Sequence, residues 1–448
     1  MTFPLGRDRR GAGIVVEVVP MKGLPPGAFF RAEGRSGGAE IPSLSRSVAD
    51  IPSEKAAVTT NFQAVERVIR AAAPYGLLQA FRDALGARYG ATGVELLMAD
   101  YSHTVLRPVA DPGCTTDPLP VHGSPEGRVF GSQEPRTYPV NDEGVLRLHL
   151  PVTVRGDRLG VLALRLPEER CTPDGVRELV DLAQILGHEI VVADRDTDVY
   201  LQARRASRLT LAAEMQWQLL PGRSCSRTEY AIGAQLEPAY AIHGDNFDWA
   251  TTAETLTLTI TNGMGEGIDA ALLTNLAVNA LRNARRAGIG IADQAALADQ
   301  ALYAQYRGDA HVSTLLLSFE LATGRVLTVD AGSPQLWRQR DRVVEQVPFE
   351  AQLPLGMFEE TDYIPQEFQA LPGDRLLFVS DGVYAALSRS GEKYGERMLA
   401  RAIQSASLLP AAAVPRAILQ ELAAHVDADA EDDALVVCLD WYGRGPVE

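Results

Sequence analysis

The sequence predicts an α+β multidomain protein, on the evidence of its length, its composition and its mixed periodicity. Its 448 residues are too many for one core of ordinary size, because domains hold roughly 150 residues each. Hydrophobic residues make up 46% and charged residues 22%, so most of the chain is able to bury a core. Both helical and strand periods recur after residue 60, which excludes a purely helical or purely β fold.

Charge and composition exclude several classes of protein. A net charge of −16 argues against binding to a nucleic-acid backbone, which requires a basic surface. No stretch approaches the roughly 20 apolar residues of a membrane helix, and no apolar run follows the N-terminal charges as in a secretory signal. The four cysteines are scattered and form no C-x-x-C pair. We therefore expect a cytoplasmic protein with reduced thiols that binds neither nucleic acid nor membrane.

The first two segments differ sharply in pattern. Residues 1–58 are rich in Gly, Pro, Ser and Arg, which is typical of a flexible leader. Helical spacing begins near Phe62. Residues 146–154 alternate as a strand, and an apolar run over residues 159–166 follows an Arg-Gly-Asp turn, which predicts a hairpin. Thr172 followed by Pro173 then predicts the N-cap and first turn of a helix. These elements define a domain over residues 60–186.

Residues 60–186 resemble a GAF sensor domain. The resemblance lies in the order of elements and in the stretch from Leu150 to Leu162, which is similar to the family's penultimate hairpin. It implies an α/β sandwich with a pocket for an unknown small molecule or protein signal. Cys114 and His122 suggest attachment or ligand residues for a chromophore or haem, but plain loop residues are the simpler interpretation.

Residues 187–221 predict a linking helix that ends at Pro221-Gly222. Two interpretations stay open: a helix that pairs with its twin in a homodimer, or an amphipathic helix packed on its own domain. The heptad column that motivates the dimer is Val192, Val199, Ala206, Ala213 and Leu220.

Four acidic or amide positions stand beside strand ends between residues 222 and 442. Asp245 lies in His-Gly-Asp-Asn-Phe-Asp, and Asn262 follows an alternating strand and opens a glycine-rich loop. Asp381 follows an apolar strand, and Asp432 precedes one. Carboxylates meeting at one rim bind hard divalent cations, which favour oxygen ligands, and two such ions activate a water against phosphorus. The glycine loop lacks the Lys-Ser/Thr of a P-loop and the spacing of a dinucleotide site, which disfavours nucleotide binding.

In this order, the motifs of residues 207–442 resemble the PPM (PP2C-type) serine/threonine phosphatases of the bacterial stress-response and sporulation branch. Four further segments carry the resemblance: residues 212–221, Asp330-Ala331-Gly332-Ser333-Pro334, Pro354-Leu355-Gly356, and Leu371-Pro372-Gly373-Asp374. The resemblance implies a PP2C-like α-β-β-α sandwich over residues 222–442 with a Mn²⁺ or Mg²⁺ site.

The resemblance also implies roles for single residues. Asp245, Asp381 and Asp432 would ligate the metals or hold their water, and the Gly263 carbonyl would add an oxygen. Asp433 and Asp248 would support them, and His243 would bind substrate phosphate or donate a proton, unless it is a loop residue without a role.

Asn262 departs from the family pattern, which has a metal-bridging aspartate here. An amide supplies an oxygen without charge, which weakens at least one metal site. Leu435 is a second departure, where Thr or Ser is common.

The leading prediction is thus a metal-dependent protein serine/threonine phosphatase, regulated by the GAF-like domain and acting on a phosphoprotein such as an anti-sigma-factor antagonist. The alternatives are a pseudophosphatase that only binds a partner, and a small-molecule sensor for which the rest is scaffold.

Overall fold

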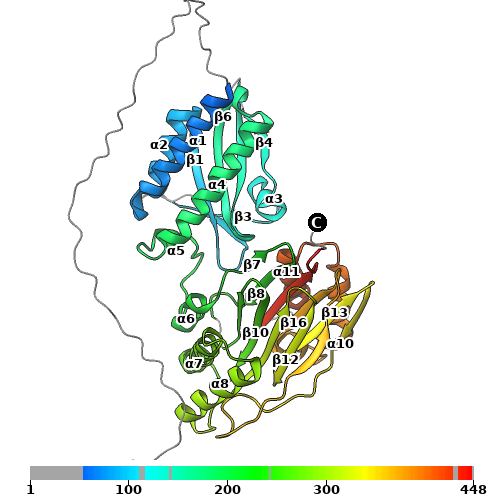
Figure 1. Ribbon diagram of the computed structural model, residues 1–448. Helices are drawn as coiled ribbons and strands as arrows, with labels where there is room; N and C mark the ends of the chain where they lie inside the picture. The colour runs from blue at the N-terminus through cyan, green and yellow to red at the C-terminus, as the bar shows by residue number, and fades with distance from the viewer. Residues whose placement is uncertain (1–53, 110–116, 141–143, 242–243, 427–431, 446–448) are drawn as a thin grey trace, which may run out of the picture. The chain divides into compact units, whose positions relative to one another are not determined.

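In the N-terminal part of the chain, helices cover both faces of a six-stranded antiparallel sheet (Figure 1). The computed structural model describes residues 54–109, 117–140, 144–241, 244–426 and 432–445, so the predicted leader, Cys114 and His243 lie outside the described residues. The sheet has the order β3-β2-β1-β6-β5-β4. Its strands are β1 (Thr92–Ala99), β2 (Val105–Pro108), β3 (Leu119–Pro120), β4 (Arg136–Pro139), β5 (Val145–Val154) and β6 (Asp157–Pro167). The helices are α1 (Glu54–Ala71), α2 (Leu77–Tyr89), α3 (Pro125–Ser132) and α4 (Pro173–Ala193).

The predicted hairpin is confirmed as β5 and β6. They pair antiparallel from Val145 opposite Pro167 to Val154 opposite Asp157. Arg155 and Gly156 form the turn with φ of 52° and 97°, and this left-handed geometry matches the twist of a two-residue hairpin. Leu150 and Leu162 lie opposite each other and are fully buried under α4, as the alternation requires.

The expected N-cap of α4 is also confirmed, because the Thr172 hydroxyl accepts a hydrogen bond from the Gly175 amide at 3.1 Å. The expected continuous helix over 187–221 is not present. The structure divides this stretch among the end of α4, α5 (Val199–Ala203) and α6 (Leu211–Leu219).

The heptad column fails because its members pack in different surroundings. Val192 is exposed, Val199 packs on the N-terminal core, and Ala213 is buried in the C-terminal core. Thr210 also caps a new helix through the Ala213 amide, so α6 begins afresh instead of continuing α4.

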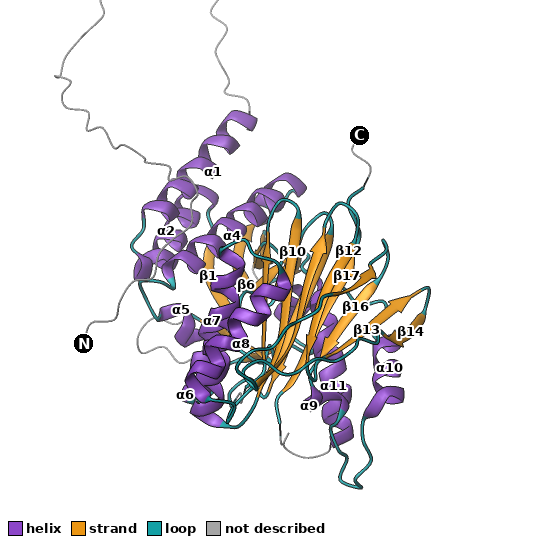
Figure 2. Ribbon diagram, turned by 60° about the horizontal axis from the view of Figure 1, so that its bottom comes forward, coloured by secondary structure: helices purple, strands orange, loops and turns teal. Residues whose placement is uncertain are grey.

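The C-terminal part is a sandwich of two antiparallel sheets with helices outside each, as predicted (Figure 2). One sheet has the order β15-β12-β11-β10-β9, and the other β14-β13-β16-β17-β8-β7. The strands are β7 (Ser224–Ser226), β8 (Tyr230–Glu237), β9 (Asn246–Thr251), β10 (Thr255–Gly263), β11 (Val312–Glu320), β12 (Arg325–Ala331), β13 (Gln335–Arg340), β14 (Val343–Gln346), β15 (Gln366–Gln369), β16 (Arg375–Val379) and β17 (Ala434–Trp441). The helices are α7 (Gly267–Arg286), α8 (Ile291–Tyr306), α9 (Asp381–Tyr384), α10 (Gly395–Ser405) and α11 (Val414–Val426), and short 3₁₀ turns include η3 (Ala411–Ala413).

Both faces of each central strand are buried. Leu315 and Leu317 of β11 point into the core between the sheets, whereas Leu316 packs under α7 and α8. Side chains alternate along a strand, so a strand covered on both faces becomes an unbroken apolar run. None of the described helices is long and apolar enough to cross a membrane.

Asp194, at the end of α4, makes the stability of the protein depend on pH. Burial raises the pKa of Asp194 to about 6, although the charge of Arg204 lowers it in part. A carboxyl whose pKa is raised on folding favours the folded state at low pH, and this contribution is lost as pH rises through about 6. We expect Asp194→Asn to gain thermal stability over the wild type on going from about pH 4 to about pH 7.

The exposed Asp196 supplies the matched control for thermal denaturation. Asp196→Asn makes the same chemical change on an exposed side chain, and an equal pH dependence of both variants would contradict the role of Asp194.

Candidate functional site

Four strands, two from each sheet of the sandwich, end or begin at the same edge. Asp245 precedes β9, Asn262 and Gly263 end β10, Asp381 follows β16, and the pair Asp432-Asp433 precedes β17. The antiparallel pairs β9–β10 and β16–β17 align these ends within each sheet, with Asn246 opposite Thr261 and Val379 opposite Val436. The edge therefore gathers the acidic and amide positions singled out in the sequence.

Asp433 joins the two sheets at this edge. Its Oδ2 accepts hydrogen bonds from the backbone amides of Gly244 at 2.8 Å and Asp245 at 3.1 Å. Asp433 is 1% exposed, so these charge-assisted bonds lie in a region of low dielectric where they are strong. Asp433 thus holds the segment that carries Asp245, the supporting role expected of it.

Two glycines allow the backbone of this segment to approach β10 closely. A Cβ at Gly244 would lie 2.4 Å from the Gly263 carbonyl oxygen, and a Cβ at Gly263 would lie 2.2 Å from Thr274 Oγ1. The Gly263 amide and the Thr274 hydroxyl both donate to the Gly244 carbonyl, at 3.2 and 2.7 Å. A side chain at either glycine would push the two strand ends apart.

Asn262 contacts Asp381 directly across the sandwich. Its amide nitrogen donates to Asp381 Oδ1 and lies 3.2 Å from Ser333 Oγ. The same Asp381 oxygen also accepts the Gly382 amide at 3.0 Å. One carboxylate oxygen of Asp381 is therefore engaged by two protein donors.

The carboxylates at this edge repel one another, which disfavours their charged forms. Burial, and then the charges of Asp433, Asp381 and Asp432, raise the pKa of Asp245 well above its ordinary value, although a hydrogen bond from Ser380 opposes this. Asp245 is 3% exposed, and its Oδ2 has no hydrogen-bond partner among the described residues. Burial and the charge of Asp432 likewise raise the pKa of Asp381, while the Asn262 amide lowers it. A cation at this edge would offset the repulsion.

The donors fit a divalent cation in kind. They are oxygens of carboxylates and of a backbone carbonyl, and the unpartnered Oδ2 of Asp245 is the sort of buried atom that a cation satisfies. The arrangement of these donors fits a cation less well than their chemistry does. Among the described residues no three acidic, histidine or cysteine side chains are arranged to hold a metal ion, and the Asn262 amide binds Asp381 in place of a cation.

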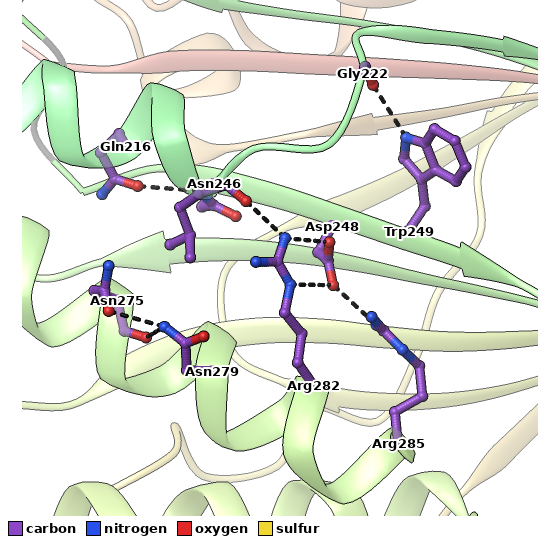
Figure 3. Close-up of polar contacts among 10 residues, drawn as sticks. Gln216, Gly222, Asn246, Asp248, Trp249, Asn275, Asn279, Arg282 and Arg285 are labelled. Carbon is purple, nitrogen blue, oxygen red and sulfur yellow. Dashed lines mark hydrogen bonds and ion pairs between the residues drawn. The ribbon is translucent and has the colours of Figure 1, made fainter. Parts of the chain in front are cut away.

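The structure thus brings together Asp245, Asn262, Gly263, Asp381 and Asp432 from the predicted site. Asp248 lies away from this edge. Its carboxylate is bound by Arg282 and Arg285 of α7 at 2.7 and 2.9 Å (Figure 3). It fastens β9 to α7.

Sequence reasoning missed Ser333, Ser380 and Tyr384. The Ser380 hydroxyl accepts a hydrogen bond from the Leu435 backbone amide at 3.0 Å. Leu435, which lacks the hydroxyl common at this position in the family, thus contributes to the site through its backbone. Tyr384 donates to the Ser333 carbonyl at 2.9 Å, and burial followed by the charge of Asp381 raises the pKa of Tyr384 to about 12. The positions of Ser333, in the Asp-Ala-Gly-Ser-Pro turn, and of Ser380, directly before Asp381, were the available signals.

Residues 252–442 match the model of the family described as stage II sporulation protein E (SpoIIE). This part of the chain is thus similar to the SpoIIE family, and the match covers 191 of the 448 residues. No curated protein matches the sequence.

Three solved structures are similar to parts of the chain. The SiaA-PP2C domain of Pseudomonas aeruginosa is 20% identical with a TM-score of 0.45, covering 51% of this chain and 93% of that one. The RsbU and RsbW domains of Rv1364c from Mycobacterium tuberculosis are 21% identical with a TM-score of 0.42, covering 49% and 61%. The phosphatase domain with a regulatory fragment of SpoIIE from Bacillus subtilis is 14% identical with a TM-score of 0.43, covering 69% and 82%.

Proposed function

We propose that residues 222–442 form a Mn²⁺- or Mg²⁺-dependent protein serine/threonine phosphatase. The observation that carries this proposal is the meeting of Asp245, Asp381 and Asp432 at one edge of the sandwich, where burial and mutual repulsion raise the pKa values of Asp245 and Asp381. Such a cluster favours cations and, through them, the phosphoryl group of a substrate.

Each part of the site has a task in this proposal. Asp245, Asp381, Asp432 and the Gly263 carbonyl would hold the cation, which when bound supplies charge to the phosphoryl oxygens and an acidified water. Asp433 positions Asp245 through the two backbone amides. His243 remains the candidate for contact with substrate phosphate, and the substrate is a phosphorylated regulatory protein such as an anti-sigma-factor antagonist.

The test of this proposal is manganese-dependent hydrolysis of p-nitrophenyl phosphate by the purified chain. Turnover is expected in the wild type and should fall at least about a hundredfold in Asp381→Ala, because a cation ligand is lost. The control is Asp374→Asn, whose carboxylate pairs with Arg340 at 2.6 Å far along the sheet from the site. Equal activity in the wild type and Asp381→Ala would refute the assignment.

A pseudophosphatase is the second candidate, and a specific contact favours it. The Asn262 amide donates to Asp381 where a cation would require a free carboxylate oxygen. In this case the same edge binds a phosphoprotein partner without hydrolysing it, and the wild type shows no turnover although it is folded.

We also propose that residues 60–186 act as a GAF-like sensor that regulates the phosphatase domain. Residues 53–448 are one compact unit, and contacts between its N-terminal and C-terminal parts support the proposal. Tyr240 donates to Asp100 Oδ2 at 2.9 Å, and the buried Arg223 donates to the Tyr101 carbonyl. Tyr240 stands five residues before Asp245, so a signal at the sensor has a short route to the site.

Tyr240→Phe tests this route, because it keeps the ring and removes the hydroxyl that donates to Asp100 and accepts the Ala206 amide. We expect the rate of p-nitrophenyl phosphate hydrolysis to change by about threefold or more, with a change in unfolding free energy near 1 kcal/mol. The control is Tyr230→Phe, which removes a hydroxyl contact with Thr251 inside the C-terminal part. An altered rate in Tyr230→Phe alone would contradict the route.

Localisation in the cytoplasm and a homodimer also belong to this proposal. Light scattering on the wild-type chain tests the dimer directly, and a monomeric mass would exclude it.

A further inference from the structure

A groove lies where the β5–β6 hairpin and α4 meet β7, β8 and η3. Its volume is about 370 Å³, within the range of small-molecule sites. The polar side chains that line it include Gln133, Thr153, Arg158, Gln184 and Ser226. Ile232 and Ala411 add apolar wall from the C-terminal part. None of the residues that line the groove belongs to the carboxylate site.

Arg158 carries the one ionised side chain among the residues that line the groove. The described residues give its guanidinium neither a hydrogen bond nor an ion pair. Its neighbour Asp157 is engaged elsewhere, because Asp157 Oδ1 accepts the Arg223 amide at 3.1 Å. The charge of Asp157 acts on Arg158, but the five guanidinium donors of Arg158 make no hydrogen bond to the described residues and are available to a ligand.

The surroundings of the groove are cationic. Besides burial, the charges of Arg223, Arg204, Arg416 and Arg158 hold the pKa of His103 well below its ordinary value. Three of these arginines donate to backbone carbonyls: Arg204 to Ala99, Arg223 to Tyr101 and Arg416 to His103. The carboxylates of Asp157, Asp100 and Glu237 act on these arginines and offset part of their charge. Four arginines against three carboxylates leave a positive balance for an anion.

We propose that this groove binds a small organic oxyanion, a carboxylate or a phosphate, on the Arg158 guanidinium, with Gln184 and Ser226 as further hydrogen-bond partners. The planar fork of arginine binds two oxygens of such a group at once. Because the walls come from both parts of residues 53–448, an occupied groove stabilises their contact. The binding is independent of the proposed phosphatase activity.

Calorimetric titration of the full chain in chelator tests the proposal, with succinate and inorganic phosphate as the two probes. At least one probe should bind saturably with a Kd of about 1 mM or below and raise the melting temperature. Arg158→Gln should weaken that binding by at least about tenfold. Arg165→Gln, which removes an exposed arginine from the same strand, should not. The stronger probe identifies which oxyanion the groove prefers.

The exposed Gln184 provides a second test that does not depend on how Arg158→Gln folds. Gln184→Glu places a negative charge at the groove and should weaken binding, whereas Gln184→Lys should strengthen it. Binding of neither probe to the wild type overturns the proposal. So does binding that is the same in Arg158→Gln, Gln184→Glu and the wild type. Because heat and melting temperature are measured, a catalytically dead protein gives the same answer.

Discussion

Asn262→Asp is expected to raise the affinity for Mn²⁺ by roughly three orders of magnitude or more, since one added charge near 4 Å from even a single positive charge is worth about 4 kcal/mol at an effective dielectric of about 20. The physical reason is local. In the wild type the Asn262 amide donates to Asp381, whereas a carboxylate would repel Asp381 and leave both groups available to a cation. Calorimetry with Mn²⁺ measures the affinity, and hydrolysis of p-nitrophenyl phosphate measures the consequence.

Asn279→Asp is the matched control, because it adds the same charge on an exposed face of α7. If the wild type already binds Mn²⁺ and hydrolyses as fast as Asn262→Asp, the pseudophosphatase alternative fails. If neither the wild type nor Asn262→Asp binds Mn²⁺ or hydrolyses p-nitrophenyl phosphate, the carboxylate edge is not a metal site, and the phosphatase proposal fails with it.

Asp248→Asn is expected to lower the unfolding free energy by about 3 kcal/mol, because it leaves buried cations without their counter-charge. The Asp248 side chain is 5% exposed, and Arg282 and Arg285 are only 18% and 17% exposed. Arg282 also donates to the Leu219 carbonyl at 2.6 Å, so the network ties α6, β9 and α7 together (Figure 3). Urea denaturation of the full chain measures the loss.

Glu367→Gln is the comparison, since it breaks an ion pair with Arg325 whose side chains are both 51% exposed. Solvent screens such a pair, so the denaturation curve should not shift. A loss of unfolding free energy of the same size in both variants would show that the buried ion pairs of Asp248 contribute no more than an exposed pair.

Local rules were enough to predict several elements. The β5–β6 hairpin follows from alternating apolar residues around a turn that needs left-handed backbone, and α4 follows from a threonine N-cap before proline. The strand β16, which leads to Asp381, is an apolar run that ends at the polar residues Ser380 and Asp381. Each of these signals lies within a few residues of the element that it predicts, so no distant contact was required.

Contacts between distant residues decided the rest. A heptad column predicted one helix over residues 187–221. In the structure Val199 packs on the N-terminal core and Ala213 lies in the C-terminal core. Burial of both residues requires a break in the helix, so tertiary packing overrides the local pattern.

By itself, then, the sequence determined the strands, the turns and the acidic positions at their ends, because these depend on neighbours along the chain. Only the tertiary structure decided that Asn262 donates to Asp381, that Asp433 holds the backbone before Asp245, and that Asp248 pairs with arginines of α7. The physical reason is that a carboxylate's role is set by the charges and donors that folding brings within about 4 Å, and these come from any part of the chain.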